Sequence, residues 1–454
     1  MRTAPPARSP FHEAFRCIGS DCEDTCCQGW NVPIDQITYQ KYRALPASPL
    51  ATMIRESIAE NPKSAAPAVV AGDDKPVFNA GSFGRILIDG KNHCPLLTAD
   101  RLCRIHAELG PQMLSYACST YPRIVHQFLG HNETALALSC PAAARLVLLD
   151  SDLLDRGLHA PPFGDAPEGT NPLPPDFLEI RQSVLWLLKL RSYPLWQRMF
   201  LLGLLCRRLD SIARGELNRS VQGFLADFKT AVQTGALRPA METLPVDRTA
   251  QLDVVLRLAG LMLHRSNVSP RFSESVQAFT SGIGNGPGAT LESLTVHYAQ
   301  AHDLSFEPFF RRHPHILENY LVNTIIRCQF PFGCDGMDVG AVPDRAQEFA
   351  KLTAQFALVR GLLIGVAGFH GAAFSTAHVV KTVQSAAKHF EHHPKFLKLA
   401  YELLTESQMD GARGMAILLR NAGQETPAAV SSSAFQSRSN LAAPGIEPIE
   451  RDAL

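Results

Sequence analysis

The sequence predicts a mainly α-helical protein in which an irregular, cysteine-rich N-terminal region with short β-hairpins precedes an α-helical domain. Two observations predict this class. Eight of the eleven cysteines fall within residues 17–140. Beyond residue 176 apolar residues recur at helical spacing and strand signals are almost absent. The N-terminal region is therefore expected to bind metal, and the second half to fold as a helical array.

Composition shifts divide the chain into four parts. We expect a cysteine-rich metal-binding region over 11–150 and a proline-rich linker over 151–175, which contains HAPPFGDAPEGTNPLPP. The α-helical domain is expected over 176–422. Residues 423–454 are rich in Ser, Ala and Pro and are expected to be disordered.

The charge balance and the apolar segments limit the partners and the compartment. Lys plus Arg equals Asp plus Glu, with 43 residues each, so no global charge favours nucleic acid or an anionic membrane. The start, MRTAPPARSP, lacks the apolar run of a secretory signal. The longest uncharged apolar stretch, GLLIGVAGF over 361–369, is too short to span a bilayer. We therefore expect a cytoplasmic protein that binds neither nucleic acid nor membrane.

The elements of the N-terminal region follow from its periodicity. Residues 34–60 have apolar positions at helical spacing. Over 84–106, short apolar runs separated by turn residues predict one or two small hairpins carrying Cys94 and Cys103. A helix starting there is expected to be interrupted at Gly110-Pro111.

The helical domain is predicted element by element. Residues 177–217 predict two amphipathic helices broken near 192–194, where Pro194 stands. Further helices are expected at 219–235, 248–265, 291–303, 314–328, 343–369, 375–390 and 395–420.

The cysteines of the N-terminal region suit a metal centre better than a disulfide scaffold, because this chain is large and its predicted compartment keeps thiols reduced. Thiolates are soft ligands that favour zinc or an iron–sulfur cluster. Eight thiols could serve two four-cysteine sites, or one cluster with the rest buried around it. His106 is an alternative ligand. The eight candidates are Cys17, Cys22, Cys26, Cys27, Cys94, Cys103, Cys118 and Cys140.

Two further expectations concern single cysteines. Adjacent side chains diverge in extended backbone, so Cys26 and Cys27 can reach one ion only from a tight turn. The easier arrangement points one of them elsewhere. Cys206, Cys328 and Cys334 are expected to be packing residues.

Four cysteine motifs, in order, carry a family resemblance. FRCIGSDCEDTCCQGWNVPID, CPLLTADRLCRIHAELG, CSTYPR and LSCPAAARLVLL resemble the flagellin lysine-N-methylase family. The first motif also resembles cysteine-cluster domains that chelate zinc or iron. HPHILENYLVNTIIRCQFPFG and LVRGLLIGVAGFH extend the resemblance, which covers roughly residues 11–400.

This resemblance implies an enzyme that transfers methyl groups from S-adenosylmethionine to lysine side chains of flagellin. It also implies a cysteine-bound metal centre, with a [4Fe–4S] cluster expected and zinc as the alternative. The eight candidate cysteines occupy the family's cysteine positions. Which four of them bind the cluster does not follow from the sequence.

A polar row on one predicted helix supplies candidate catalytic residues. Asn319, Asn323 and Arg327 share a face at i, i+4 and i+8, flanked by Glu318 and Tyr320. By pattern alone this row suits a solvated face, whereas the resemblance favours a substrate pocket. We therefore expect Glu318, Tyr320, Asn323 and Arg327 to be catalytic.

The sequence does not locate the cofactor. GIGNGPG, residues 282–288, follows a predicted helix rather than a strand, so we expect an interhelical loop there. The C-x3-C-x2-C spacing of radical enzymes is absent, which favours polar displacement. An adenosyl pocket is expected in the helical half. Two other classes remain open: a non-catalytic metal-stabilised binding protein and an iron–sulfur redox protein.

Overall fold

A computed structural model describes most of the chain, and it divides into two compact units. The cysteine unit comprises Met1–Gly164, Arg265–Ser273 and Thr376–Pro394; the helical unit comprises Asp165–His264, Glu274–Ser375 and Lys395–Leu454. The described residues are 14–30, 32–61, 83–90, 93–128, 131–154, 159–160, 176–263, 268–333, 344–392 and 394–420. The expected tail and most of the expected linker lie outside them.

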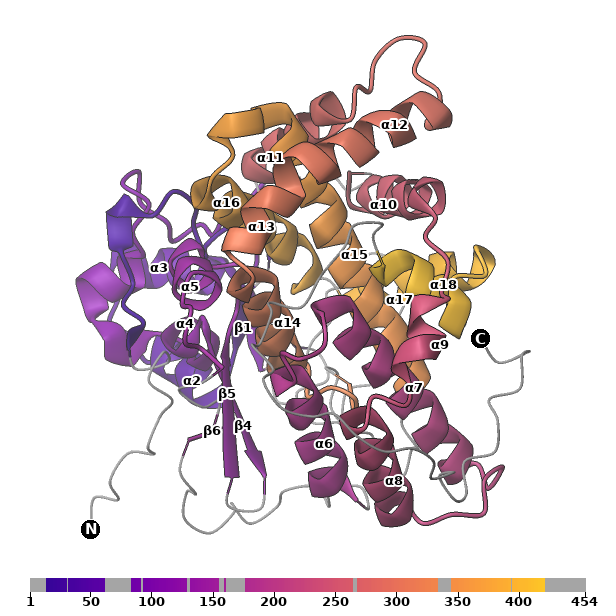
Figure 1. Cartoon of the computed structure of the whole chain (residues 1–454). Coiled ribbons are helices and arrows are strands. Elements are labelled where there is room, and N and C mark those ends of the chain that lie inside the picture. Colours follow the sequence, from indigo (N-terminus) through magenta and orange to yellow (C-terminus); the bar gives the residue numbers. More distant parts are fainter. Residues whose placement is uncertain are drawn as a thin grey trace. The chain divides into compact units, whose positions relative to one another are not determined.

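The cysteine unit combines short helices with two small sheets (Figure 1). Its first part contains η1 (Gly19–Asp21), β1 (Val32–Ile34), α2 (Gln36–Arg43), α3 (Pro49–Glu56), β2 (Ile58–Glu60) and β3 (Gly84–Ile86). Its second part contains η2 (Ile105–Leu109), η3 (Pro111–Met113), α4 (Tyr116–Thr120), β4 (Arg123–Phe128), β5 (His131–Leu136), α5 (Pro141–Leu148), β6 (His159–Ala160) and α16 (Thr376–Phe390). The irregular character and the break at Gly110-Pro111 are confirmed. The β4–β5 hairpin was not predicted.

Both sheets are antiparallel and three-stranded, in the orders β1-β3-β2 and β4-β5-β6. The first sheet contributes to a hydrophobic core with α2 and α3, in which Ile34 and Ile54 are fully buried. Cys94 belongs to this core, and Cys27, Cys103 and Cys118 pack against it. The loops that carry these cysteines are therefore fixed by ordinary hydrophobic packing as well as by any metal.

Helix α16 belongs to the cysteine unit, although the sequence analysis placed residues 375–390 in the helical domain. It packs against α5. Its residues from Val379 to Phe390 are mostly buried, with Val379, Val383 and Ala386 at zero exposure. The chain therefore returns to the cysteine unit long after leaving it.

In the described part of the chain, the helical unit consists of helices and no strands. The helices are α6 (Phe177–Lys189), α7 (Leu195–Ala213), α8 (Val221–Gln233), α9 (Arg238–Glu242), α10 (Arg248–Leu263), α11 (Pro270–Gly282, from Glu274 onward), α12 (Leu291–Ala301), η4 (His302–Phe306), α13 (Glu307–Arg312), α14 (His315–Arg327), α15 (Arg345–His370), η5 (Gly371–Ala373), α17 (Pro394–Glu406) and α18 (Ala412–Leu419). The mainly α class and the break before Pro194 are confirmed. The stretch predicted as one helix over 395–420 forms two.

Helix α15 is the central helix of this unit and contacts α7, α10, α12 and α18 (Figure 1). In the described part of the chain, Arg345–Ala373 is the one helical stretch with the length and hydropathy of a membrane span. However, 89% of its most apolar window is buried inside the protein. Its apolar character is therefore explained by its place in the core.

Helices α11 and α15 approach each other through glycines. A Cβ at Gly282 would lie 1.8 Å from the carbonyl oxygen of Gly365, and a Cβ at Gly365 would lie 2.6 Å from that of Phe279. The two backbones can pack this closely only because no side chain stands between them.

We predict that Gly282→Ala destabilises the protein by about 2–3 kcal/mol, because the methyl group forces the two backbones apart. Gly260→Ala is the matched control. Gly260 lies inside α10 with no atom near a Cβ, so alanine there is expected to add about 0.5–1 kcal/mol. Urea unfolding of both variants measures the difference; equal stabilities would contradict this account of the contact.

The three cysteines expected to be packing residues differ. Cys206 is a fully buried free thiol in α7, as expected. Cys328 is buried but disulfide-bonded, so its assignment as a simple packing residue was wrong. Cys334 lies outside the described residues.

Candidate metal centre

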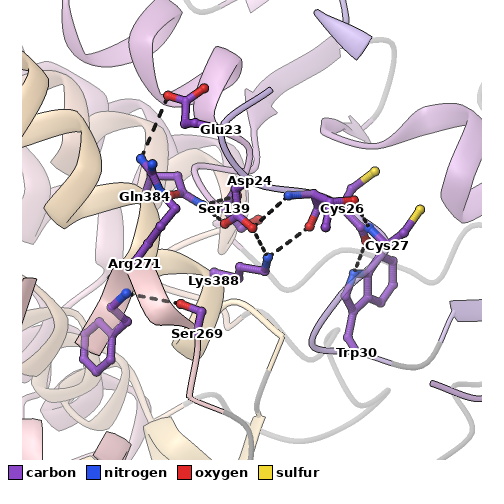
Figure 2. Close-up of polar contacts among 12 residues, drawn as sticks. Glu23, Asp24, Cys26, Cys27, Trp30, Ser139, Ser269, Arg271, Gln384 and Lys388 are labelled. Carbon is purple, nitrogen blue, oxygen red and sulfur yellow. Dashed lines mark hydrogen bonds and ion pairs between the residues drawn. The ribbon is translucent and has the colours of Figure 1, made fainter. Parts of the chain in front are cut away.

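The Cys26-Cys27 pair lies in a tight turn, and both sulfur atoms point to the same side (Figure 2). The Thr25 hydroxyl accepts the Cys27 amide at 3.1 Å, and the Trp30 indole N–H donates to the Cys26 carbonyl at 2.9 Å. The expectation that one of the two thiols points elsewhere was therefore wrong. The turn removes the divergence that extended backbone would impose.

Three thiols are in direct contact. Hydrogen bonds join Cys27 to Cys26 and to Cys94, and the Cys94 amide donates to the Cys27 carbonyl at 2.7 Å. The bond from Cys27 lowers the pKa of Cys26 to about 7, with a further contribution from the Lys388 ammonium, and lowers the pKa of Cys94. The same two bonds raise the pKa of Cys27. A lowered pKa makes Cys26 and Cys94 better sulfur donors for a soft cation, because the thiolate is the form that binds metal.

Cys103 and Cys118 lie within electrostatic range of this trio. Burial raises the pKa of both thiols, and it raises that of Cys118 to about 12. Electrostatic interactions with Cys26 and Cys94 raise both pKa values further. The backbone amides of Ile105 and His106 face the Cys103 sulfur. The His106 side chain itself is exposed.

The remaining three cysteines are linked to one another and to Cys26 by electrostatic interactions. Cys140 is the N-cap residue of α5. Its thiol interacts electrostatically with Cys22 and Cys26, and the Cys22 thiol interacts in the same way with Cys17. Burial raises the pKa of Cys22 and that of Cys140, the latter to about 12. Cys17 is exposed. The eight predicted ligands are therefore all free thiols of one unit, in a group of five and a group of three.

The cysteine sulfurs are suitable ligands for a thiophilic metal, but their side chains are not arranged as a coordination sphere. Among the described residues, no three His, Cys, Asp or Glu side chains are arranged to hold an ion. Cys26, Cys27 and Cys94 are the nearest to such an arrangement, and Cys103 and Cys118 are the adjacent candidates for a fourth ligand. Side-chain rotations within this group of five would have to complete the site.

Helix α16 clamps the cysteine loop through a buried ion pair (Figure 2). The Lys388 ammonium donates to the Asp24 carboxylate at 2.6 Å and to the Thr25 carbonyl at 3.0 Å. Gln384 donates to the other carboxylate oxygen of Asp24 at 2.8 Å. Both ions of the pair are at most 8% exposed. The turn that carries Cys26 and Cys27 is therefore held by a helix more than 360 residues further along the chain.

The same helix, together with Glu391 directly after its last residue, fixes the segment that precedes Cys140. The Glu391 carboxylate accepts the backbone amides of Leu138 at 3.2 Å and Ser139 at 3.0 Å, and Gln384 donates to the Ser139 carbonyl at 2.8 Å. Sequence reasoning did not find Gln384, Lys388 or Glu391. Buried charges in α16 were a signal, because Lys388 interrupts a face of buried small and apolar residues.

The predicted catalytic residues lie in the helical unit, on α14. The helix is buried on all sides from Ile316 to Ile326, so the alternative of a solvated face is excluded. Glu318 is 4% exposed. Arg198 donates to one of its carboxylate oxygens at 2.7 Å, and Arg191 donates twice to the other, at 2.8 and 3.0 Å. Two guanidinium groups thus occupy this carboxylate, which suits a structural anchor better than a proton acceptor.

The other members of the predicted set share this buried helix. Tyr320 and Asn323 are at most 3% exposed, whereas Arg327 is half-buried at the end of α14. The Tyr320 ring lies 6.4 Å from that of Phe356. Their catalytic role stays a prediction. Residues 283–290 form the interhelical loop expected for GIGNGPG.

Comparison with known proteins places the chain in a family. Residues 181–418, more than half of the chain, match the model of the FliB lysine N-methylase C-terminal domain. The chain belongs to this family, as the cysteine motifs had indicated. No solved structure matches it.

Three curated proteins give the same result. The flagellar biosynthetic protein FliU of Salmonella muenchen is 33% identical over 148 residues, which cover 32% of this chain and 79% of FliU. Lysine-N-methylases of Salmonella typhimurium and Salmonella choleraesuis are each 32% identical over 145 residues. That match spans 32% of this chain and only 32% of each methylase.

Proposed function

We propose that this protein is a lysine N-methyltransferase that uses S-adenosylmethionine to methylate flagellin and carries a sulfur-bound metal centre. The observation that carries the proposal is the match of residues 181–418 to a lysine N-methylase domain. The names of the curated relatives, a flagellar biosynthetic protein and two lysine-N-methylases, support the substrate and the reaction.

The proposed reaction is a displacement at the methyl group bonded to the sulfonium sulfur. The lysine nitrogen attacks the methyl carbon. A bond between this nitrogen and the methyl carbon forms as the carbon–sulfur bond breaks, and S-adenosylhomocysteine leaves as a neutral thioether. A lysine with a pKa of about 10.4 is almost wholly protonated at neutral pH, so one proton must leave for water before the attack. The protein's main contribution is then to hold amine and methyl group in line.

The proposed centre is a [4Fe–4S] cluster, with zinc as the alternative. Cys26, Cys27 and Cys94 would hold it, with a fourth sulfur from Cys103 or Cys118. Such a centre would tie together loops that are distant in the sequence. Soft sulfur donors, and the lowered pKa of Cys26 and of Cys94, support this assignment.

We place the reaction in the cytoplasm, because the eight thiols of the cysteine unit are unpaired and such thiols persist in reducing compartments. The disulfide of Cys328 in the helical unit is the exception. Neither nucleic acid nor a membrane is part of the proposal, since acidic and basic residues balance at 43 each.

The test is methyl transfer by protein purified without oxygen. We expect label from the methyl group of S-adenosylmethionine to appear on flagellin lysines, located by mass spectrometry of peptides. Flagellin whose lysines have been acetylated is the control and is expected to stay unlabelled. Binding of flagellin without any transfer would favour the scaffold class and contradict the enzymatic proposal.

A further inference from the structure

A cavity of about 560 Å³ lies in the cysteine unit beside Cys94. Three segments contribute residues to its lining: four residues between Glu23 and Gln28, eight between Asp89 and Arg101, and residues 269–271 at the start of α11. All of them belong to the cysteine unit. Small-molecule sites typically measure about 300–1,000 Å³. The cavity therefore suits a small molecule and is too small for a folded domain.

The lining carries charges of both signs. Three carboxylates, Glu23, Asp24 and Asp89, and two guanidinium groups, Arg101 and Arg271, contribute to it. Asp24 is already bonded to Lys388 and Gln384, and Glu23 is paired with Arg145. A ligand that carries one sign alone would meet like charges on part of this wall. A ligand with separated positive and negative groups can pair with both parts.

The polar groups on the wall are held in place by the fold. Arg271 lies 3.9 Å from Glu23 and donates to Gln384 at 3.0 Å, as Figure 2 shows. Asp24 is fixed by Lys388. Asp89 accepts the amide of His93 at 2.9 Å. A wall fixed before binding reduces the ordering cost that a ligand must overcome.

Apolar surface forms the rest of the wall. Pro95, Leu97, Ala99 and Pro270 line the cavity between the charged groups. Such residues supply flat contact area for an aromatic base, and the amide of Gln28 adds a neutral donor and acceptor. The cavity thus offers separate places for an aromatic group, an anionic group and cationic groups.

We propose that this cavity binds an amino-acid-bearing nucleoside of mixed charge, namely the methyl donor S-adenosylmethionine. Its carboxylate pairs with Arg101, its ammonium pairs with Asp89, and its adenine packs on the apolar residues. This inference rests on the proposed function. It places the donor beside Cys94 in the cysteine unit, whereas the sequence analysis expected an adenosyl pocket in the helical half.

A lysine side chain is the weaker candidate for the same cavity. It carries no anionic group, so Arg101 would have no counterpart in it. A neutral or protonated amine would also leave the apolar wall without a flat partner. The arrangement of charges therefore favours the donor over the acceptor.

A bulky residue inside the cavity tests the proposal. Ala99 lines the cavity and is exposed, so Ala99→Trp fills the site without disturbing the core. Ala47 is an exposed residue of the same unit outside the cavity, and Ala47→Trp is the matched control. Calorimetric titration of oxygen-free, full-length protein with S-adenosylmethionine is expected to show at least tenfold weaker binding for Ala99→Trp and wild-type binding for the control.

A second variant separates charge from bulk. Arg101→Gln removes a cation of the wall, and we expect its Kd for S-adenosylmethionine to rise about tenfold, the effect of losing one charge-assisted hydrogen bond. S-adenosylhomocysteine keeps the carboxylate, so its binding is expected to weaken by a similar factor. Circular dichroism checks that each variant is folded.

The outcomes distinguish this inference from the proposed function. Wild-type binding by Ala99→Trp and Arg101→Gln, in a protein that still methylates flagellin, would overturn the cavity assignment and leave the enzyme intact. Absence of both binding and transfer in the wild-type protein would overturn both. The inference is supported only if both Ala99→Trp and Arg101→Gln bind S-adenosylmethionine more weakly than the wild-type protein.

Discussion

Lys388→Met is expected to destabilise the cysteine unit by about 3–5 kcal/mol. The substitution keeps the length of the side chain but leaves the Asp24 carboxylate buried without its cation, at 7% exposure. Gln384 still donates one hydrogen bond, which cannot replace the ion pair. Removing one partner of a buried pair typically has an effect of this size. The midpoint of urea unfolding, followed by circular dichroism, measures it.

The double variant Asp24→Asn with Lys388→Met is the decisive companion to this experiment. It also removes the buried carboxylate charge of Asp24, so we expect it to restore a large part of the free energy of unfolding that Lys388→Met loses. Lys41→Met is the matched control, because Lys41 is exposed in the same unit and only donates to the Gln112 carbonyl. Its effect should stay below about 1 kcal/mol. Equal effects at Lys41 and Lys388 would show that α16 does not clamp the cysteine loop.

Glu318→Gln is expected to destabilise the helical unit by a similar amount, about 3–5 kcal/mol. The neutral amide places N–H donors beside Arg198, whose side chain is 7% exposed. A buried guanidinium then loses its counterion. Arg191 is half-exposed and can turn to water, so Arg198 accounts for most of the effect.

The companion variant also separates an anchor from a catalytic group. Glu318→Gln with Arg198→Met removes both charges and is expected to regain stability. If Glu318 is an anchor, methyl transfer should recover together with stability. A stable but inactive double variant would instead indicate that the carboxylate takes part in the reaction. Glu406→Gln, at a carboxylate 74% exposed, is the control and should change stability by less than about 0.5 kcal/mol.

The helices of the helical unit could be predicted because their signals are local. Apolar residues at helical spacing, together with Pro194, were enough to separate α6 from α7. The burial of α14 could not be predicted in the same way. Asn319 and Asn323 have the chemistry of surface residues, and only the helices packed around α14 show that its polar row is enclosed.

The candidate site was predictable as a set of residues but not as a geometry. The density of thiols in residues 17–140 indicated the candidate ligands, whose role in binding metal stays a prediction. The clamp by α16 escaped sequence reasoning because the Asp24–Lys388 pair joins residues 364 positions apart, a distance over which no periodicity acts. The cavity was missed for the same reason, since its third segment, residues 269–271, comes from the middle of the chain.

The most direct test of the metal centre is the iron, acid-labile sulfide and zinc content of protein purified without oxygen. Our account predicts about four iron and four sulfide per chain. It also predicts that Cys26→Ser and Cys94→Ser lower both, while Cys206→Ser, a buried thiol of the helical unit, leaves both unchanged. Zinc without iron would contradict the cluster, and a folded protein that contains neither metal would contradict the centre itself.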